Sequence, residues 1–297
     1  IILGEQIMCD EYTVIEDEEY LAKRGITRRD FGKIGVGVSL IAMLPPVANA
    51  QDVSEREVEI ETPDGMADGY FVHPSAGRHP AIIMWPDVLS IRPTYRLMAK
   101  RLAQSGYSVF LANPYYRTYK GRIAPEGAAY SDPEVRAQVT PHRNSLSAET
   151  AVIDGIAYVS WLDQQDSVDT SRKVGSAGYC MTGSYTFRLA AALPGRVGAG
   201  ASFHGGGLAS DNANSPHFLI PQMQAGMLVA IAQNDDERGP EAKEILRESF
   251  DAAGVSAEIE VYPANHGWTH ADSSVYDEEQ AERAWARMLE LFETNLS

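Results

Sequence analysis

The sequence predicts an α/β fold in which a mainly parallel central sheet is flanked by helices on both faces. Two observations lead to this prediction. Short and almost continuously apolar segments, such as PAIIMW at Pro80–Trp85, alternate with longer segments whose apolar residues recur every three or four positions. The short segments are typical of parallel strands buried on both faces, and the longer ones are typical of helices that cover such a sheet.

Each expected element follows from its own pattern. Glu57–Thr62 and Gly69–His73 flank Pro63-Asp64-Gly65, which predicts a strand, a turn and a second strand. Further strands are expected at Pro80–Trp85, Tyr107–Ala112, Lys173–Ala177, Val197–Phe203, Met227–Ala232 and Ala257–Tyr262. Helices are expected at Pro93–Gln104, Ser145–Gln165, Ser184–Leu193, Pro240–Ala253 and Asp277–Asn295. No repeat or internal linker interrupts the alternation, so a single domain is expected over residues 51–297.

The first 50 residues have the layout of an export signal. A twin arginine, Arg28-Arg29, precedes the apolar run Ile34–Leu44 and the small-residue site Ala48-Asn49-Ala50. This layout predicts a twin-arginine signal cleaved after Ala50, and hence a periplasmic or exported protein. The alternatives are a buried helix or an uncleaved anchor in a cytoplasmic protein. The segment before Arg28 is acidic, whereas such signals usually begin with positive charge.

Charge and cysteine content narrow the possible partners. The formal net charge of −16 disfavours nucleic acid and anionic membranes, because both select surfaces rich in Lys and Arg. The chain has two cysteines, Cys9 and Cys180. Cleavage after Ala50 would leave Cys180 as a lone thiol in a compartment that oxidises thiols. Such a thiol is a candidate functional group.

The segment Gly178–Gly183 (GYCMTG) lies between an expected strand and an expected helix. This is the arrangement of a nucleophile elbow, a sharp turn that exposes a nucleophilic side chain. The following helix N-terminus would lower the pKa of the Cys180 thiol and offer N–H groups to an oxyanion. The alternative is a buried and inert cysteine. Thr182 stands where such elbows usually carry glycine.

Two further residues complete a possible catalytic triad. Asp235 follows the strand Met227–Ala232, and His266 follows the strand Ala257–Tyr262. The order nucleophile, acid, histidine is that of α/β-hydrolases. Because parallel strands end at one edge of the sheet, the three side chains can converge there. We expect His266 to take the thiol proton and Asp235 to orient the imidazole.

Other residues compete for these roles. Asp236 and Glu237 are alternative acids, and His204 is an alternative base that is otherwise read as structural. His266 and His270 have the four-residue spacing of a zinc pair, but such a pair needs a helix and a third ligand. No metal is therefore expected.

Residues Pro80–Leu291 resemble the dienelactone hydrolase family. The matching segments are MWPDVLSIRP (Met84–Pro93), ANPYYR (Ala112–Arg117), GYCMTGS (Gly178–Ser184), SFHGGGL (Ser202–Leu208), AQND (Ala232–Asp235) and NHGW (Asn265–Trp268). The resemblance implies an α/β-hydrolase fold and a triad of Cys180, His266 and Asp235. It also implies hydrolysis of an enol-lactone from aromatic-ring degradation without a cofactor.

The resemblance assigns roles to several other positions. The N–H of Met181 and an amide near Val88 match the family's oxyanion donors. Asp87 takes the place of a glutamate that interacts with the resting thiol. Arg117 matches an arginine that binds the substrate carboxylate, and His270 replaces a second arginine, so a charge there requires a protonated imidazole.

The remaining expectations concern the pocket and the substrate. Tyr115 and Trp268 are expected to line the site. The main hypothesis is a thiol hydrolase of small esters or lactones, with the small-molecule substrate as its partner and the choice between monomer and dimer left open. The alternatives are a general carboxylesterase for neutral substrates, and a binding or redox-sensing protein in which Cys180 is an oxidisable thiol.

Overall fold

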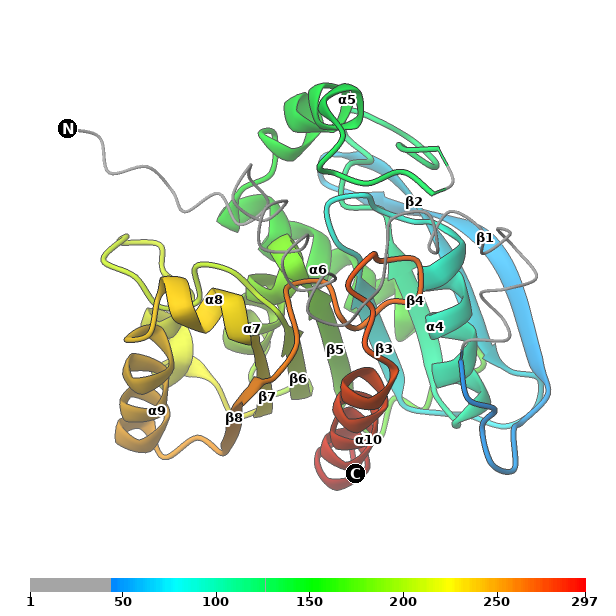
Figure 1. The fold of residues 1–297 in the computed structure, drawn as a ribbon. Helices are drawn as coiled ribbons and strands as arrows, with labels where there is room; N and C mark the ends of the chain where they lie inside the picture. Colours follow the sequence, from blue (N-terminus) through cyan, green and yellow to red (C-terminus); the bar gives the residue numbers. More distant parts are fainter. Residues whose placement is uncertain (1–43, 126) are drawn as a thin grey trace.

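The computed structural model describes residues 44–125 and 127–297. The expected twin arginine and all of the expected apolar run except Leu44 lie outside these residues, so the export signal stays a prediction. Within the described part, no helix combines the length and apolar character that crossing a membrane requires. One eight-stranded sheet runs through the molecule in the order β1-β2-β4-β3-β5-β6-β7-β8 (Figure 1).

The sheet begins antiparallel and becomes parallel. The strands are β1 (Val53–Thr62), β2 (Gly65–Pro74), β3 (Ala81–Trp85), β4 (Ser108–Ala112), β5 (Val174–Tyr179), β6 (Val197–Phe203), β7 (Gly226–Ala232) and β8 (Ala257–Tyr262). The β1–β2 hairpin is antiparallel, as is β2 against β4, and the remaining pairs are parallel. The expected α/β fold with a mainly parallel sheet is thereby confirmed, because every expected strand is present.

Helices cover both faces of this sheet (Figure 1). They are α4 (Pro93–Gln104), α5 (Pro133–Arg143), α6 (Ala148–Leu162), α7 (Gly183–Ala192), α8 (Gln233–Arg238), α9 (Ala242–Ala253) and α10 (Glu278–Asn295), with short 3-10 turns at Cys180–Thr182 and Pro216–Gln222. Helices α4 and α10 pack into one hydrophobic core, and α6, α7 and α9 pack into a second core on the opposite face.

Two helices were not expected, and several expected helices begin later than predicted, α6 by the largest margin. Helix α8 follows β7 directly, so Asp235 lies in a helical turn instead of a loop. Helix α5 is mostly polar and contains Pro141, so its sequence lacks the regular apolar spacing that predicts a helix. Helix α6 begins at Ala148 and not at Ser145, because the Ser147 hydroxyl accepts from the Thr150 N–H and caps the helix there.

Helix α5 lies beyond the carboxyl ends of the strands (Figure 1). Its buried residues Val135 and Val139 share a small apolar cluster with Val88 and Tyr115, which follow β3 and β4. Met181, next to the candidate nucleophile, packs against the same cluster. The cluster therefore covers the edge of the sheet at which the candidate site residues gather.

Candidate functional site

Cys180 lies in a strained turn immediately after β5. Its φ angle is 57°, in the left-handed region that most side chains avoid, and its side chain is buried. Close packing explains the glycines on either side. A Cβ at Gly178 would come 2.3 Å from the Thr182 carbonyl oxygen, and one at Gly183 would come 2.6 Å from the Gly205 Cα. The expected elbow geometry is thus present around Cys180.

Thr182 has a structural role that explains its departure from glycine. Its hydroxyl accepts from the Tyr179 N–H at 3.0 Å and lies 2.8 Å from the carbonyl oxygen of Trp85, to which it donates. Trp85 is the last residue of β3. The hydroxyl therefore ties the elbow to the neighbouring strand and holds the turn that presents Cys180.

His266 is held on its far side by Asp235. The Nδ1 atom of His266 lies 2.7 Å from Oδ2 of Asp235, and the His266 N–H donates to the Asn234 side chain at 2.9 Å. Burial opposes charge on the imidazole. The carboxylate of Asp235 and the thiolate of Cys180 outweigh burial and hold the pKa of His266 well above its ordinary 6.5.

The neighbouring acid is oriented differently. Asp236 forms an ion pair with Lys243 at 2.6 Å and is not paired with a histidine. The structure therefore brings Cys180, His266 and Asp235 together, whereas Asp236 pairs with Lys243. Asp235 is the better candidate for the orienting acid on this geometry.

A second histidine lies beside the same thiol. His204 follows β6, is completely buried and has a ring centroid 4.6 Å from that of His266. Its Nε2 atom is 3.0 Å from the Thr269 hydroxyl. Burial lowers the pKa of His204 below 6.5, although a hydrogen bond with Cys180 acts in the opposite direction. His204 is therefore neutral near pH 7, unlike His266.

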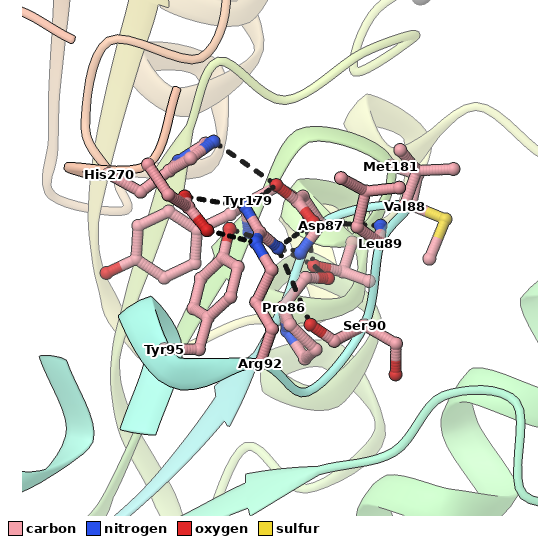
Figure 2. Close-up of polar contacts among 12 residues, drawn as sticks. Pro86, Asp87, Val88, Leu89, Ser90, Arg92, Tyr95, Tyr179, Met181 and His270 are labelled. Carbon is pink, nitrogen blue, oxygen red and sulfur yellow. Dashed lines mark hydrogen bonds and ion pairs between the residues drawn. The ribbon is translucent and has the colours of Figure 1, made fainter. Parts of the chain in front are cut away.

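Asp87 is clamped in a buried ion-pair network. Both of its oxygens accept from the Arg92 guanidinium, at 2.6 and 2.8 Å, and Arg92 also pairs with Asp272 at 2.6 Å. Nε2 of His270 lies 3.2 Å from Asp87 on another side. Figure 2 shows the carboxylate between the Arg92 guanidinium and the His270 ring. Asp87 is thus a fixed anchor of its loop.

Electrostatics keep this carboxylate ionised. Burial raises the pKa of Asp87, but Arg92 and then His270 outweigh burial and bring the pKa below its ordinary 3.8. Burial also lowers the pKa of His270 to about 4. His270 is therefore neutral near pH 7. Its imidazole would carry a positive charge for a substrate only at a much lower pH.

The expected oxyanion region is organised by Tyr115. Its hydroxyl donates to the Val88 carbonyl oxygen at 2.8 Å and lies 3.5 Å from the Met181 sulfur. Val88 and Met181 lie together in Figure 2, next to Asp87. Leu89 N–H donates to the Asp87 carboxylate at 2.9 Å and fixes the same loop. Tyr115 thus restrains the loop after β3 through this hydrogen bond.

Arg117 and Trp268 are both held by other side chains. Arg117 donates to Asp64 and, through two nitrogens, to Asp154 at 2.7 and 2.9 Å. Trp268 is completely buried and stacks on Tyr262, with ring centroids 5.3 Å apart. Both expected substrate contacts stay predictions, but the donors of Arg117 are already used by two carboxylates.

The sequence reasoning did not identify Arg92, Asp272 or Thr269. Arg92 lies within the MWPDVLSIRP segment, five residues after Asp87, and that spacing was the available signal. Asp272 and Thr269 lie close to His270 on the loop after β8, and only the fold brings Asp272 to Arg92 and Thr269 to His204. Among the residues that the structure describes, no His, Cys, Asp and Glu cluster is suited to a metal ion.

The sheet order, the elbow at the end of β5 and the histidine–aspartate pair behind it define the molecule as an α/β-hydrolase. The model of the "Dienelactone hydrolase family" matches residues 67–296. The chain therefore belongs to the dienelactone hydrolase family and is a carboxylic ester hydrolase by class.

Curated relatives span most of the chain. A Synechocystis protein named "Putative carboxymethylenebutenolidase" is 28% identical over 254 residues, which cover 82% of this chain and 98% of the relative. The "Carboxymethylenebutenolidase" of Pseudomonas sp. strain P51 is 24% identical over 219 residues, which cover 73% of this chain and 86% of the relative.

Solved structures agree on the fold. A structure from Klebsiella pneumoniae, named "Putative Dienelactone Hydrolase", superposes on this chain with a TM-score of 0.69 at 23% sequence identity. The superposition covers 82% of this chain and 99% of the Klebsiella chain. The dienelactone hydrolase-like promiscuous phosphotriesterase P91 superposes with a TM-score of 0.66 at 20% identity, with the same two coverages.

The ion-pair network yields a stability prediction. Arg92→Met removes the cation but leaves the buried Asp87 carboxylate, so we expect a loss of about 3–5 kcal/mol in the free energy of unfolding. Urea unfolding monitored by circular dichroism measures it.

Arg96→Met is the matched control, because Arg96 pairs with Glu57 at the surface and such pairs contribute at most about 1 kcal/mol. Equal losses in the two variants would contradict the anchoring role of Arg92.

Proposed function

We propose that the protein hydrolyses small esters or lactones through Cys180, with His266 as general base and acid and Asp235 as the orienting carboxylate. One observation carries this proposal. A buried thiol on a left-handed elbow faces an imidazole whose other nitrogen is 2.7 Å from a carboxylate. A thiol with no catalytic role would not need a histidine–aspartate pair behind it.

The chemistry follows from this arrangement. The thiolate of Cys180 attacks the carbonyl carbon, and the carbonyl oxygen takes up the negative charge. When the carbon–oxygen bond to the leaving group breaks, His266 gives its proton to the departing oxygen and a thioester remains. Water then attacks the thioester, His266 takes the water's proton, and the thiolate leaves with the acid product released. In a lactone both product groups stay on one molecule.

The developing oxyanion needs donors fixed in advance. The N–H of Met181, at the start of the turn into α7, and an amide near Val88 are proposed for this role. The bond from Tyr115 to the Val88 carbonyl and the clamp on Asp87 support this proposal, since both restrain the loop after β3.

Two candidate functions differ in the charge of the substrate, which is anionic in one and neutral in the other. The names of the relatives favour an enol-lactone of the carboxymethylenebutenolide type, as in aromatic-ring catabolism. The pairing of Arg117 with Asp64 and Asp154 favours the second candidate, a carboxylesterase for neutral substrates. An arginine whose donors already face two carboxylates attracts a third carboxylate weakly, so we favour neutral esters and lactones.

Cys180→Ala tests the chemistry. Because acyl transfer requires the covalent step, we expect hydrolysis of p-nitrophenyl acetate and of a lactone panel to be abolished in a folded protein. Cys180→Ser should fold and turn over much more slowly, because a triad arranged for a thiolate activates a hydroxyl poorly. Residual activity above a few per cent in the alanine variant would refute the assignment and leave a binding or redox-sensing role.

Asp235→Asn and Asp236→Asn form a matched pair for the orienting acid. The amide at Asp235 would favour the wrong tautomer of His266, and we expect up to about 10⁴-fold loss in kcat, the size known for the serine protease triad. Asp236→Asn removes only the partner of Lys243 and should change kcat little. The reverse ranking would move the role to Asp236.

Arg117→Ala tests the substrate class. We expect neutral and anionic esters of similar size to slow by the same factor, because the change leaves Asp154 buried without its cation and acts on the protein alone. The measurement is the ratio of kcat/KM for the two substrates in each variant. A selective loss of about tenfold or more for the anionic substrate would restore the carboxylate-binding role.

A further inference from the structure

Four polar side chains, those of Asp87, His270, Thr269 and His204, form a hydrogen-bonded row that leads from Asp87 toward the Cys180 thiol. Nε2 of His270 lies 3.2 Å from Oδ2 of Asp87, and Nδ1 of His270 lies 3.3 Å from the Thr269 hydroxyl. The same hydroxyl is 3.0 Å from Nε2 of His204. The members come from the loops after β3, β6 and β8, and all are buried.

One end of this row has a fixed polarity. Arg92 pairs with both oxygens of Asp87, so the carboxylate stays ionised and can only accept hydrogen bonds. A neutral His270 has a single N–H. The carboxylate places that hydrogen on Nε2, because an unprotonated Nε2 would set a lone pair against a negative charge. Nδ1 of His270 is then an acceptor.

The direction of each hydrogen bond in this row is then fixed by the bond before it. The only hydrogen of the Thr269 hydroxyl goes to Nδ1 of His270, and the hydroxyl oxygen then accepts from Nε2–H of His204. His204 is neutral, so its remaining nitrogen, Nδ1, carries a lone pair and no hydrogen. Among the described residues, this Nδ1 has no aligned hydrogen-bond partner, although His204 is completely buried.

Cys180 and His204 are neighbours in the fold, because the residues just before them, Tyr179 and Phe203, are paired in adjacent parallel strands. Burial lowers the pKa of His204, and the nearby Cys180 acts against burial through a hydrogen bond and its charge. We propose that His204 is a second hydrogen-bond acceptor for the Cys180 thiol, and that Asp87, His270 and Thr269 fix the tautomer that makes it one. This inference deepens the proposed function, because it assumes only that Cys180 is the functional thiol.

The two histidines therefore act on the thiol in opposite ways. The carboxylate of Asp235 stabilises the protonated form of His266, so His266 accepts the thiol proton and stabilises the thiolate. His204 accepts from S–H and stabilises the neutral thiol, which raises the thiol pKa and slows its reaction with electrophiles and oxidants. The second acceptor sets how reactive the resting enzyme is.

Thr269→Val tests the relay. Without the hydroxyl, Nε2–H of His204 loses its acceptor and the ring is free to carry its hydrogen on Nδ1, where it donates to the thiolate. A hydrogen bond to the charged form lowers the thiol pKa, so alkylation by iodoacetamide well below the wild-type pKa should become about tenfold faster. The rate is followed against pH.

Three features make the alkylation result specific. Thr269→Ser keeps the hydroxyl and should retain the wild-type profile. Thr94→Val removes a buried hydroxyl that has no partner among the described residues, and it should also leave the profile unchanged. The other titratable groups that face the thiol, namely Asp87, Tyr115 and His266 with Asp235, are the same in all variants. An unchanged or slower rate in Thr269→Val would overturn the proposal.

The tautomer can also be read directly. Nitrogen-15 NMR of the histidine-labelled protein, with His204→Gln used for assignment, should show His204 protonated on Nε2 and unprotonated on Nδ1 near pH 7. A hydrogen on Nδ1 in the wild-type protein would refute the relay. Neither experiment uses an ester substrate, so a failure of the relay and a failure of the proposed hydrolysis are distinguishable.

Discussion

The parallel register of five strands determines where every polar group of the site can lie. β3, β5, β6, β7 and β8 run side by side in the same direction, so their carboxyl ends meet at one edge. Each end delivers one residue within four positions: Asp87, Cys180, His204, Asp235 and His266 follow these strands in turn. The site depends on this register more than on any single contact, because no two of these strands are joined by a short turn.

Burial at that edge then forces the polar groups to pair. A buried ionised carboxylate without partners is costly, so Asp87 has Arg92 and His270, and Asp154 has Arg117 and Tyr116. The first pairing stiffens the loop that carries the proposed oxyanion donor near Val88. The second withdraws a cation that a substrate could otherwise use. The cost of burying an unpaired charge thus accounts for both ion-pair networks.

The sequence predicted what strand ends and local patterns determine. The strands at Val197–Phe203 and Ala257–Tyr262 have the expected bounds, and residues after them reach the site. It did not predict partners that only the fold creates. Arg117 was expected to bind a substrate carboxylate, and its pairing with Asp154 was not predicted, because no local pattern encodes how the helix that carries Asp154 is placed. Asp272 reaches Arg92, and Thr269 reaches His204, through the same long-range packing.

Two imidazoles beside one thiol raise the question of how the fold gives them different roles. The difference lies in what stands behind each ring. Asp235 places a negative charge on the far nitrogen of His266, so the protonated ring is favoured despite burial. Thr269 offers His204 only a neutral hydroxyl, so burial prevails and that ring stays uncharged. Two residues of the same type therefore differ in proton affinity because their second partners differ in charge.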